Sequence, residues 1–187
     1  MGRLVLGMFL TIDGFTQSES GEMIGPAWSS DMQTYWSEAN AREGQMLLYG
    51  RTAFEFNAIF WPAMADDEKA PEGFRSFATV MNQLPKVVIS RTLASAEWNA
   101  TVKSAPLEET IATLKQEFDG DIVAVGGVQL ATGLLASEQL DELRLLVVPK
   151  IAGRGRSIFD GTAVARTFSL HSNQTLDTGA IVLTYRS

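Results

Sequence analysis

Two adjacent glycines follow an apolar run and precede a helical pattern. The run covers residues 122–125, the pair is Gly126 and Gly127, and the helical segment begins with Val128, Gln129 and Leu130. Residues without a side chain let the backbone approach a ligand closely. A helix N-terminus offers free N–H groups and a partial positive charge. This order of residues therefore predicts a pyrophosphate-binding turn that runs from the glycine pair into the first turn of the helix.

Two further apolar runs, residues 46–49 and 87–89, end in residues of a similar kind. Small residues, hydroxyls and arginines follow both runs: Gly50, Arg51 and Thr52 after the first, and Ser90, Arg91 and Thr92 after the second. Such residues leave room for a ligand and supply hydrogen-bond donors and positive charge. Three strand ends of this type predict a sheet that binds a phosphorylated nucleotide at its carboxyl edge.

The composition is that of an ordinary globular domain and argues against several partners. The 187 residues are 45% hydrophobic and 20% charged, which fits one domain over residues 1–187. A net charge of −7 argues against nucleic acid and anionic membranes as partners. No apolar run approaches the roughly 20 residues of a membrane span. With no cysteine and one histidine, we expect no metal site, and we place the protein in the cytoplasm.

Apolar runs alternate with helical patterns along the chain. Strands are expected over residues 3–10, 45–49, 86–90, 121–125 and 140–148, and a closing hairpin over 169–185. Helices are expected from Ser30, capped by Ser30 with Gln33, and over 52–60, 74–84, 107–118 and after Gly127. Trp61-Pro62 is expected to end the second helix. The pattern predicts an α/β domain with a mostly parallel central sheet, flanking helices and an antiparallel C-terminal hairpin.

Five motifs occur in one order over nearly the whole chain: residues 11–15, 48–55, 86–93, 125–127 and 140–156. In this order they resemble the dihydrofolate reductase-like fold. They are most similar to the C-terminal reductase domain of the bifunctional riboflavin biosynthesis deaminase/reductase and its small stand-alone relatives. The resemblance implies a nicotinamide cofactor. No acidic residue follows the strand at 86–90, where a ribose diol would need one, so NADPH is favoured over NADH.

The resemblance implies a role for each strand end. Gly50, Arg51 and Thr52 would lie along the NADPH phosphates, and Ser90, Arg91 and Thr92 would hold the 2′-phosphate. The glycine pair, joined by a bond that is often cis in relatives, would meet the pyrophosphate and the nicotinamide side together with Val128, Gln129 and Leu130. The backbone of Thr11 and Ile12 would lie by the carboxamide. Each group also has a purely structural interpretation, as a strand–helix turn with a solvated arginine.

Four side chains are candidates for the substrate side and for catalysis. Asp13 would lie near the reacting centre, although Asp-Gly also forms turns. Asp31 occupies the position of the substrate-binding carboxylate of dihydrofolate reductases, although an aspartate in a first helical turn is favoured by the dipole alone. Trp28 and Phe54 would line the pocket, with a core position as the alternative for Trp28.

The sequence departs from the riboflavin-pathway reductases at the substrate side. Val125 stands where those reductases carry an acidic residue before the glycine pair. Arg154 and Arg156, between glycines, form either an anion site or a dimer contact, and His171 is expected at a strand edge without a catalytic role. The resemblance also implies a homodimer.

Three functions remain open from the sequence, beside a structural domain in which the glycine pair and the arginines serve packing alone. The first is an NADPH-dependent reductase that transfers a hydride to a C=N or C=O carbon of a small heterocyclic substrate, as 5-amino-6-(5-phosphoribosylamino)uracil reductase does. The second is a dihydrofolate or pteridine reductase. The third is an NADPH-binding module without turnover.

Overall fold

The computed structural model describes residues 1–40, 42, 44–161 and 165–187. Its strands are β1 (Arg3–Thr11), β2 (Met46–Gly50), β3 (Lys86–Ile89), β4 (Ala100–Lys103), β5 (Asp121–Val125), β6 (Glu142–Val148), β7 (Ser169–Thr175) and β8 (Ile181–Arg186). Its helices are α1 (Ser30–Asn40), α2 (Arg51–Asp66), α3 (Glu72–Gln83), α4 (Leu107–Glu117) and α5 (Val128–Ala136). None of these helices is long and apolar enough to cross a membrane.

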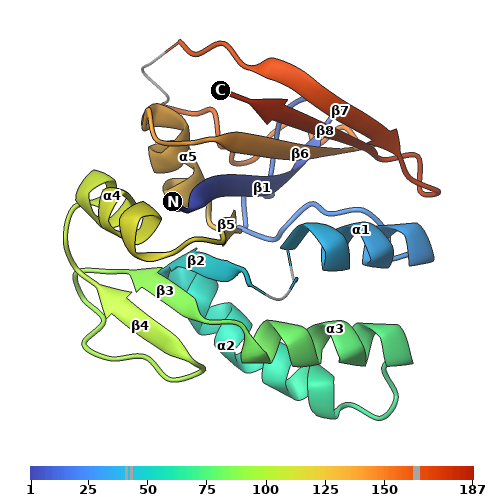
Figure 1. The fold of residues 1–187 in the computed structure, drawn as a ribbon. Coiled ribbons are helices and arrows are strands. Elements are labelled where there is room, and N and C mark those ends of the chain that lie inside the picture. Colours follow the sequence, from blue (N-terminus) through green and yellow to red (C-terminus); the bar gives the residue numbers. More distant parts are fainter. Residues whose placement is uncertain (41, 43, 162–164) are drawn as a thin grey trace.

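The strands form one sheet in the order β4-β3-β2-β5-β1-β6-β8-β7 (Figure 1). The strands from β4 to β6 pair in parallel, and β8 pairs antiparallel with both β6 and β7. This topology confirms the expected α/β fold with a mostly parallel sheet and an antiparallel C-terminal hairpin. Parallel strands place their carboxyl ends at one edge of the sheet, which we call the carboxyl edge, and their N-termini at the opposite edge, the amino edge.

Helices cover both faces of the sheet, so the central strands are buried on both sides. On one face, Leu4 and Leu6 of β1 share a cluster with the apolar residues of α4 and α5. On the other face, Val5 shares a cluster with Trp61 of α2 and Phe77 of α3, and the sheet continues under α1. The alternation of side chains along β1 therefore joins the two layers into one core.

Two local expectations were wrong, and one strand was missed. Helix α2 continues through Pro62 to Asp66, because the buried Trp61 packs edge-on against Phe77 of α3, with ring centroids 5.1 Å apart. The stabilisation from this packing outweighs the loss of the backbone hydrogen bond that proline cannot donate. The cap of α1 is Ser29, not Ser30, since the Ser29 hydroxyl accepts the N–H of Met32 at 3.1 Å. Strand β4 was not expected, because this short edge strand carries no apolar run.

Candidate functional site

The carboxyl edge gathers the strand ends that were singled out in the sequence. Strands β3, β2, β5 and β1 are parallel neighbours in that order, so Ser90, Gly50, Gly126 and Thr11 lie along one edge. Helices α2 and α5 both begin at this edge, immediately after Gly50 and Gly127. The structure thus brings two helix N-termini together at the ends of adjacent strands.

The starts of α2 and α5 lie close together, and a β-carbon added at either glycine would contact the other helix. A β-carbon added at Gly127 would lie 3.5 Å from Cβ of Ala53 in α2, and one added at Gly50 would lie 3.7 Å from Cβ of Leu130 in α5. Gly126 and Gly127 have φ angles of +76° and +84°, a region that residues with side chains rarely adopt. The bond between them is trans, because the described residues contain no cis peptide, so the cis form implied by the resemblance is not present.

A hollow of about 380 Å³ lies beside the first turn of α5. One side is formed by Val128, Gln129 and Thr132, and the other by Arg156, Ser157 and Asp160 of the segment that follows β6. The exposed side chain of Arg156 therefore lies beside a helix N-terminus, which makes it a candidate ligand for an anion. The sequence predicted either an anion site or a dimer contact for Arg156. It did not predict that Arg156 lies beside the start of α5.

The backbone around Arg156 is held firmly. The Arg156 N–H donates to the Gln17 carbonyl at 2.8 Å, and the Arg156 carbonyl accepts the N–H of Thr16 at 2.9 Å. A β-carbon at the preceding Gly155 would lie 2.2 Å from the Gln17 carbonyl oxygen, so this position requires glycine. Gly155, directly before Arg156, was the signal in the sequence that this segment packs closely against another part of the chain.

The other candidate phosphate ligands lie at the ends of β2 and β3. Arg51 is half-exposed and forms an ion pair with Glu55 one turn along α2, with Nη1 3.2 Å from Oε2. The Ser90 hydroxyl accepts the N–H groups of Thr92 and Leu93 at 3.2 and 3.0 Å, which folds the chain back after β3. This turn leaves Arg91 exposed at the carboxyl edge, with no partner among the described residues for its guanidinium.

Asp13 braces the end of β1. Its carboxylate accepts the hydroxyl of Thr11 at 2.6 Å and the N–H groups of Ala152 and Gly153 at 3.1 and 2.7 Å. The hydrogen bond from Thr11, followed by those from the backbone, lowers the pKa of Asp13 to about 2. Asp13 is therefore ionised at neutral pH, and a carboxylate in this state holds no proton to donate.

Asp31 binds the turn of the β7–β8 hairpin. Its Oδ2 accepts the N–H of Asp177 at 3.1 Å, and the Asp177 carboxylate in turn accepts the hydroxyl of Ser29 at 2.5 Å. Asp31 is exposed in the first turn of α1, as the dipole argument allows. Within the described ranges, no three acidic, histidine or cysteine side chains lie together as a metal ion would need.

The two aromatic candidates lie in different surroundings. Trp28 is 43% exposed, and its ring packs edge-on against Phe74 of α3 with centroids 4.8 Å apart. Phe54 is only 5% exposed and packs against Tyr49 and Trp98 in the core, at 6.3 and 5.9 Å between centroids. Because Phe54 has almost no accessible surface, we remove it from the substrate side and retain Trp28.

Comparison with known families matches residues 3–182 to the RibD C-terminal domain, over the same β1–β8 sheet that carries the carboxyl-edge site. The chain belongs to this family. The RibD C-terminal domain is a reductase domain, so the general class of the protein is that of an oxidoreductase. The resemblance stated from five short motifs is thereby confirmed.

Individual relatives are distant in sequence. The uncharacterized protein YyaP of Bacillus subtilis is 24% identical over 185 residues, 98% of this chain and 94% of YyaP. A putative riboflavin biosynthesis protein from Shewanella sp. PV-4 has a TM-score of 0.70 at 17% identity and covers 100% of this chain and 98% of its own. Dihydrofolate reductase from Enterococcus faecalis, complexed with NADP(H), has a TM-score of 0.66 at 15% identity, with 98% and 95% covered.

A bifunctional relative places the domain in context. The deaminase and 5-amino-6-(5-phosphoribosylamino)uracil reductase from Thermotoga maritima has a TM-score of 0.67 at 17% identity. The match covers 99% of this chain and 56% of that one. At such identities the solved structures show a shared dihydrofolate reductase-like fold.

Proposed function

We propose that the protein is an NADPH-dependent reductase that acts on a small heterocyclic substrate at a C=N or C=O carbon. The observation that carries the proposal is the meeting of the α2 and α5 N-termini across Gly50, Gly126 and Gly127. Two helix ends with free N–H groups, separated by residues without side chains, suit a pyrophosphate. Membership of a reductase-domain family supports the same conclusion.

The residues at the carboxyl edge fit the cofactor in chemical terms. The first amides of α5, at Val128, Gln129 and Leu130, and those at the start of α2, with Arg51 and Thr52, would bind the pyrophosphate. Arg156 would add positive charge from the far side of the hollow. Arg91 with Ser90 and Thr92 would hold the 2′-phosphate, and Thr11 and Ile12 would flank the nicotinamide with their backbone.

When bound, the nicotinamide cofactor supplies the hydride. The chain's own contribution is to orient the two reactants and to fix the end of β1. Asp13 performs the second task through its bonds to Ala152 and Gly153, and its negative charge remains constant across the neutral pH range. Asp31 and Trp28 lie on the α1 side, where we place the substrate.

The substrate side favours a substrate different from that of the riboflavin-pathway reductase. Val125 is buried at the end of β5 and offers no carboxylate. We therefore propose a small heterocycle that needs no acidic contact at this position. The enzyme is further proposed to work as a cytoplasmic homodimer, for which a sedimentation mass near twice 20.4 kDa is the test.

The proposal is tested first by titrating the protein with NADPH and with NADH while the fluorescence of its four tryptophans is followed. Saturable binding that favours NADPH is expected. A panel of imines and carbonyl compounds, including pteridines, then tests turnover through loss of NADPH absorbance. Binding without turnover on any compound would favour an NADPH-binding module, and no binding of either cofactor would overturn the proposal.

Arg91→Ala is expected to weaken NADPH binding about tenfold and to leave NADH binding nearly unchanged. Only NADPH carries the 2′-phosphate, and one hydrogen bond to a charged group is worth about 1.5–3 kcal/mol, where 1.4 kcal/mol is a factor of ten. The measurement is the dissociation constant of each cofactor, and NADH, which lacks the 2′-phosphate, is the control. Equal losses for NADPH and NADH would contradict the assignment of Arg91.

Arg156→Ala is expected to weaken both cofactors by about tenfold, because a pyrophosphate contact is common to NADPH and NADH. Arg154→Ala is the matched control. Arg154 lies two residues away, is exposed, and has an ion pair to Glu19 at 3.7 Å rather than a place in the hollow. If the two variants lose affinity equally, the effect is one of general charge in this segment and Arg156 is not a ligand.

A further inference from the structure

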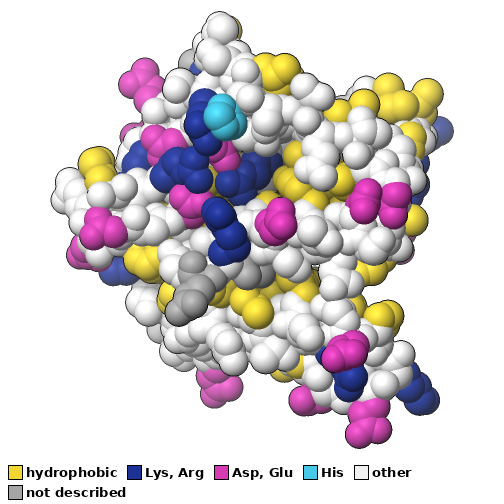
Figure 2. All heavy atoms as spheres, turned by 45° about the vertical axis from the view of Figure 1, so that its right-hand side comes forward, with side chains coloured by type: hydrophobic (Ala, Val, Ile, Leu, Met, Phe, Trp, Pro, Cys, Tyr) yellow, Lys and Arg dark blue, Asp and Glu magenta, His cyan; other side chains and the backbone are white. Residues whose placement is uncertain are grey.

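A second hollow, of about 390 Å³, lies at the amino edge, between the C-terminal end of α1, the first residues of β1 and β6, and the β7–β8 hairpin. Figure 2 shows the chain's single histidine, His171, above a group of Lys and Arg side chains with acidic groups between them. From Arg3 at the start of β1 the lining extends along the sheet beside α1 as far as Val182, which pairs with Leu146 of β6. It shares no residue with the hollow beside α5 or with the strand ends of the carboxyl edge. The second hollow is therefore distinct from the proposed cofactor site.

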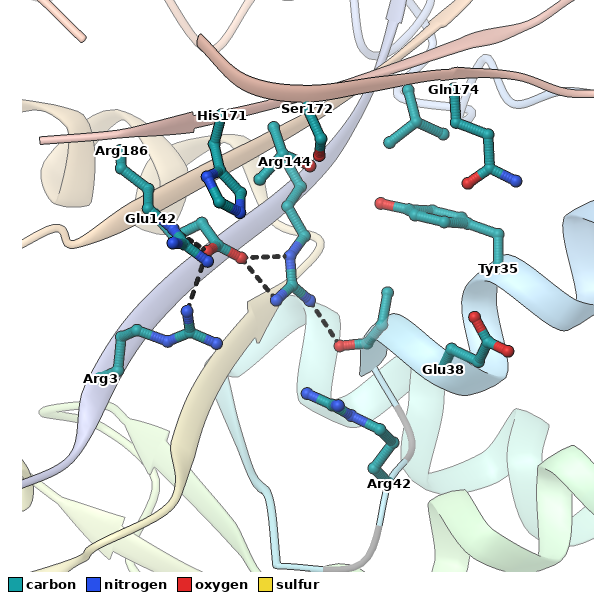
Figure 3. A pocket seen from close by; sticks show the side chains of 13 residues that line it. Arg3, Tyr35, Glu38, Arg42, Glu142, Arg144, His171, Ser172, Gln174 and Arg186 are labelled. Atoms are coloured by element: carbon teal, nitrogen blue, oxygen red, sulfur yellow. Dashed lines mark hydrogen bonds and ion pairs between the residues drawn. The ribbon is translucent and has the colours of Figure 1, made fainter. Parts of the chain in front are cut away.

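A buried carboxylate arranges the arginines of this hollow. Glu142 is 2% exposed, and it accepts hydrogen bonds from Nε of Arg144 at 2.7 Å, Nε of Arg186 at 2.9 Å and Nη1 of Arg3 at 3.0 Å (Figure 3). Burial disfavours its charge, but the bonds and charges of Arg186, Arg144 and Arg3 outweigh burial and hold the pKa of Glu142 below its usual value. The guanidiniums are thus fixed before any ligand arrives, which lowers the entropic cost of binding.

Several donors of the hollow remain unused. Arg186 binds Glu142 only through Nε, so within the part of the chain that the structure describes both of its Nη groups are free. Among the described residues, the guanidinium of Arg42 contacts only Asp121, through Nη2 at 3.4 Å. Figure 3 shows the hydroxyl of Tyr35 and the ring of His171 directed toward the arginines. Burial raises the pKa of Tyr35 to about 12, so this hydroxyl keeps its proton and remains a donor.

The hollow is positive in a protein that is negative as a whole. Four guanidiniums, on Arg3, Arg42, Arg144 and Arg186, line the hollow against two lining carboxylates, Glu38 and Glu142. Of the two further carboxylates near Arg3, Asp121 pairs with Arg3 and Arg42, and Asp141 is paired with Lys115. The chain carries a net charge of −7. A local surplus of fixed positive charge attracts an anion despite the opposing global field.

We propose that this hollow is a second ligand site, which binds the phosphate monoester of a small polyhydroxyl molecule. The free Nη groups of Arg186, with Arg42, match the oxygens of a phosphoryl group in the manner of arginine forks. The volume exceeds what one phosphate needs, and Ser172 and Gln174 of β7 line the remaining space with groups that bind hydroxyls. The site is independent of the proposed reductase function, because no residue is shared with the carboxyl edge.

Ribose 5-phosphate is a suitable probe, and His171 is a suitable reporter. The chain has one histidine, so its imidazole gives one recognisable set of NMR signals without assignment. Titration at constant ionic strength is expected to shift these signals saturably, with a dissociation constant below about 1 mM. Ribose without phosphate is expected to cause no shift, and saturating NADPH is expected to leave the titration unchanged.

Two variants locate the binding. Arg186→Gln and Arg42→Ala are each expected to weaken binding at least about fivefold, whereas Lys69→Ala, which removes an exposed cation between α2 and α3, is expected to have no effect. Arg42 is exposed and loosely paired, so its removal keeps the test valid should the Arg186 variant fold poorly. Three results would each overturn the proposal. They are the absence of a saturable shift, an equal loss of affinity in the Lys69 variant, and displacement of the probe by NADPH.

Discussion

Replacing Gly127 with valine is expected to weaken NADPH binding at least about 100-fold, equivalent to about 2.7 kcal/mol. The φ angle of +84° is a costly conformation for a β-branched residue. The added side chain would also occupy the gap toward Ala53, where the starts of α2 and α5 face each other. Fluorescence titration with NADPH measures the effect.

The matched control is Gly44→Val. Gly44 has a φ angle of +81° and no atom within 4 Å of an added β-carbon, and it lies before β2, at the amino edge. Both substitutions therefore place a β-branched residue at a similar positive φ angle, but only one stands in the proposed cofactor site. If both variants fold and bind NADPH with unchanged affinity, the glycine pair serves only strand–helix packing.

Glu142→Ala is expected to lower the free energy of unfolding by about 3–5 kcal/mol, because it leaves the buried guanidinium of Arg144 without its carboxylate. Chemical denaturation measures this loss. Glu55→Ala is the control, since its ion pair with Arg51 is about half-exposed on both sides and is worth at most about 0.5 kcal/mol. Similar losses in the two variants would show that the network around Glu142 contributes little.

The loss of unfolding free energy in Glu142→Ala also has a defined pH dependence. The folded protein holds the pKa of Glu142 below its ordinary value of 4.5, which the unfolded chain approaches. A group with a lowered folded pKa stabilises the protein above the unfolded pKa, and that contribution disappears as the pH falls through the folded pKa. The difference between the wild-type protein and Glu142→Ala is therefore expected to be constant near neutral pH and to shrink below about pH 4.5. A difference that grows on acidification would contradict this sign.

The sequence predicted those features that depend on neighbouring residues. The glycine pair after an apolar run predicted a strand–helix turn, and the structure has β5, Gly126, Gly127 and α5 in that order. The closing hairpin expected over 169–185 is likewise present as β7 and β8, and Gly179 has a positive φ angle in its turn. Local pattern could not predict that α2 continues through Pro62, because the stabilising contact of Trp61 with Phe77 joins residues of different helices.

The candidate site was predictable at the strand ends and less so elsewhere. Gly50 and Gly127 could be placed at one edge because parallel strands require it. Arg156 could not be placed beside α5, since its position depends on backbone pairing with Gln17, far away in the chain. The bonds of Asp13 to Ala152 and Gly153 and the burial of Phe54 were hidden for the same reason.

The central position of β1 has a consequence for how the chain folds during synthesis. Both partners of this strand come late, since Arg3 pairs with Asp121 of β5 and Val5 pairs with Glu142 of β6. At about 5–20 residues per second, β1 is synthesised roughly 6–24 s before its first partner strand, β5. During that interval an apolar strand of nine residues has no neighbour in its own sheet. The middle of the sheet is therefore completed among the last steps, and the nascent chain needs protection from association for most of its synthesis.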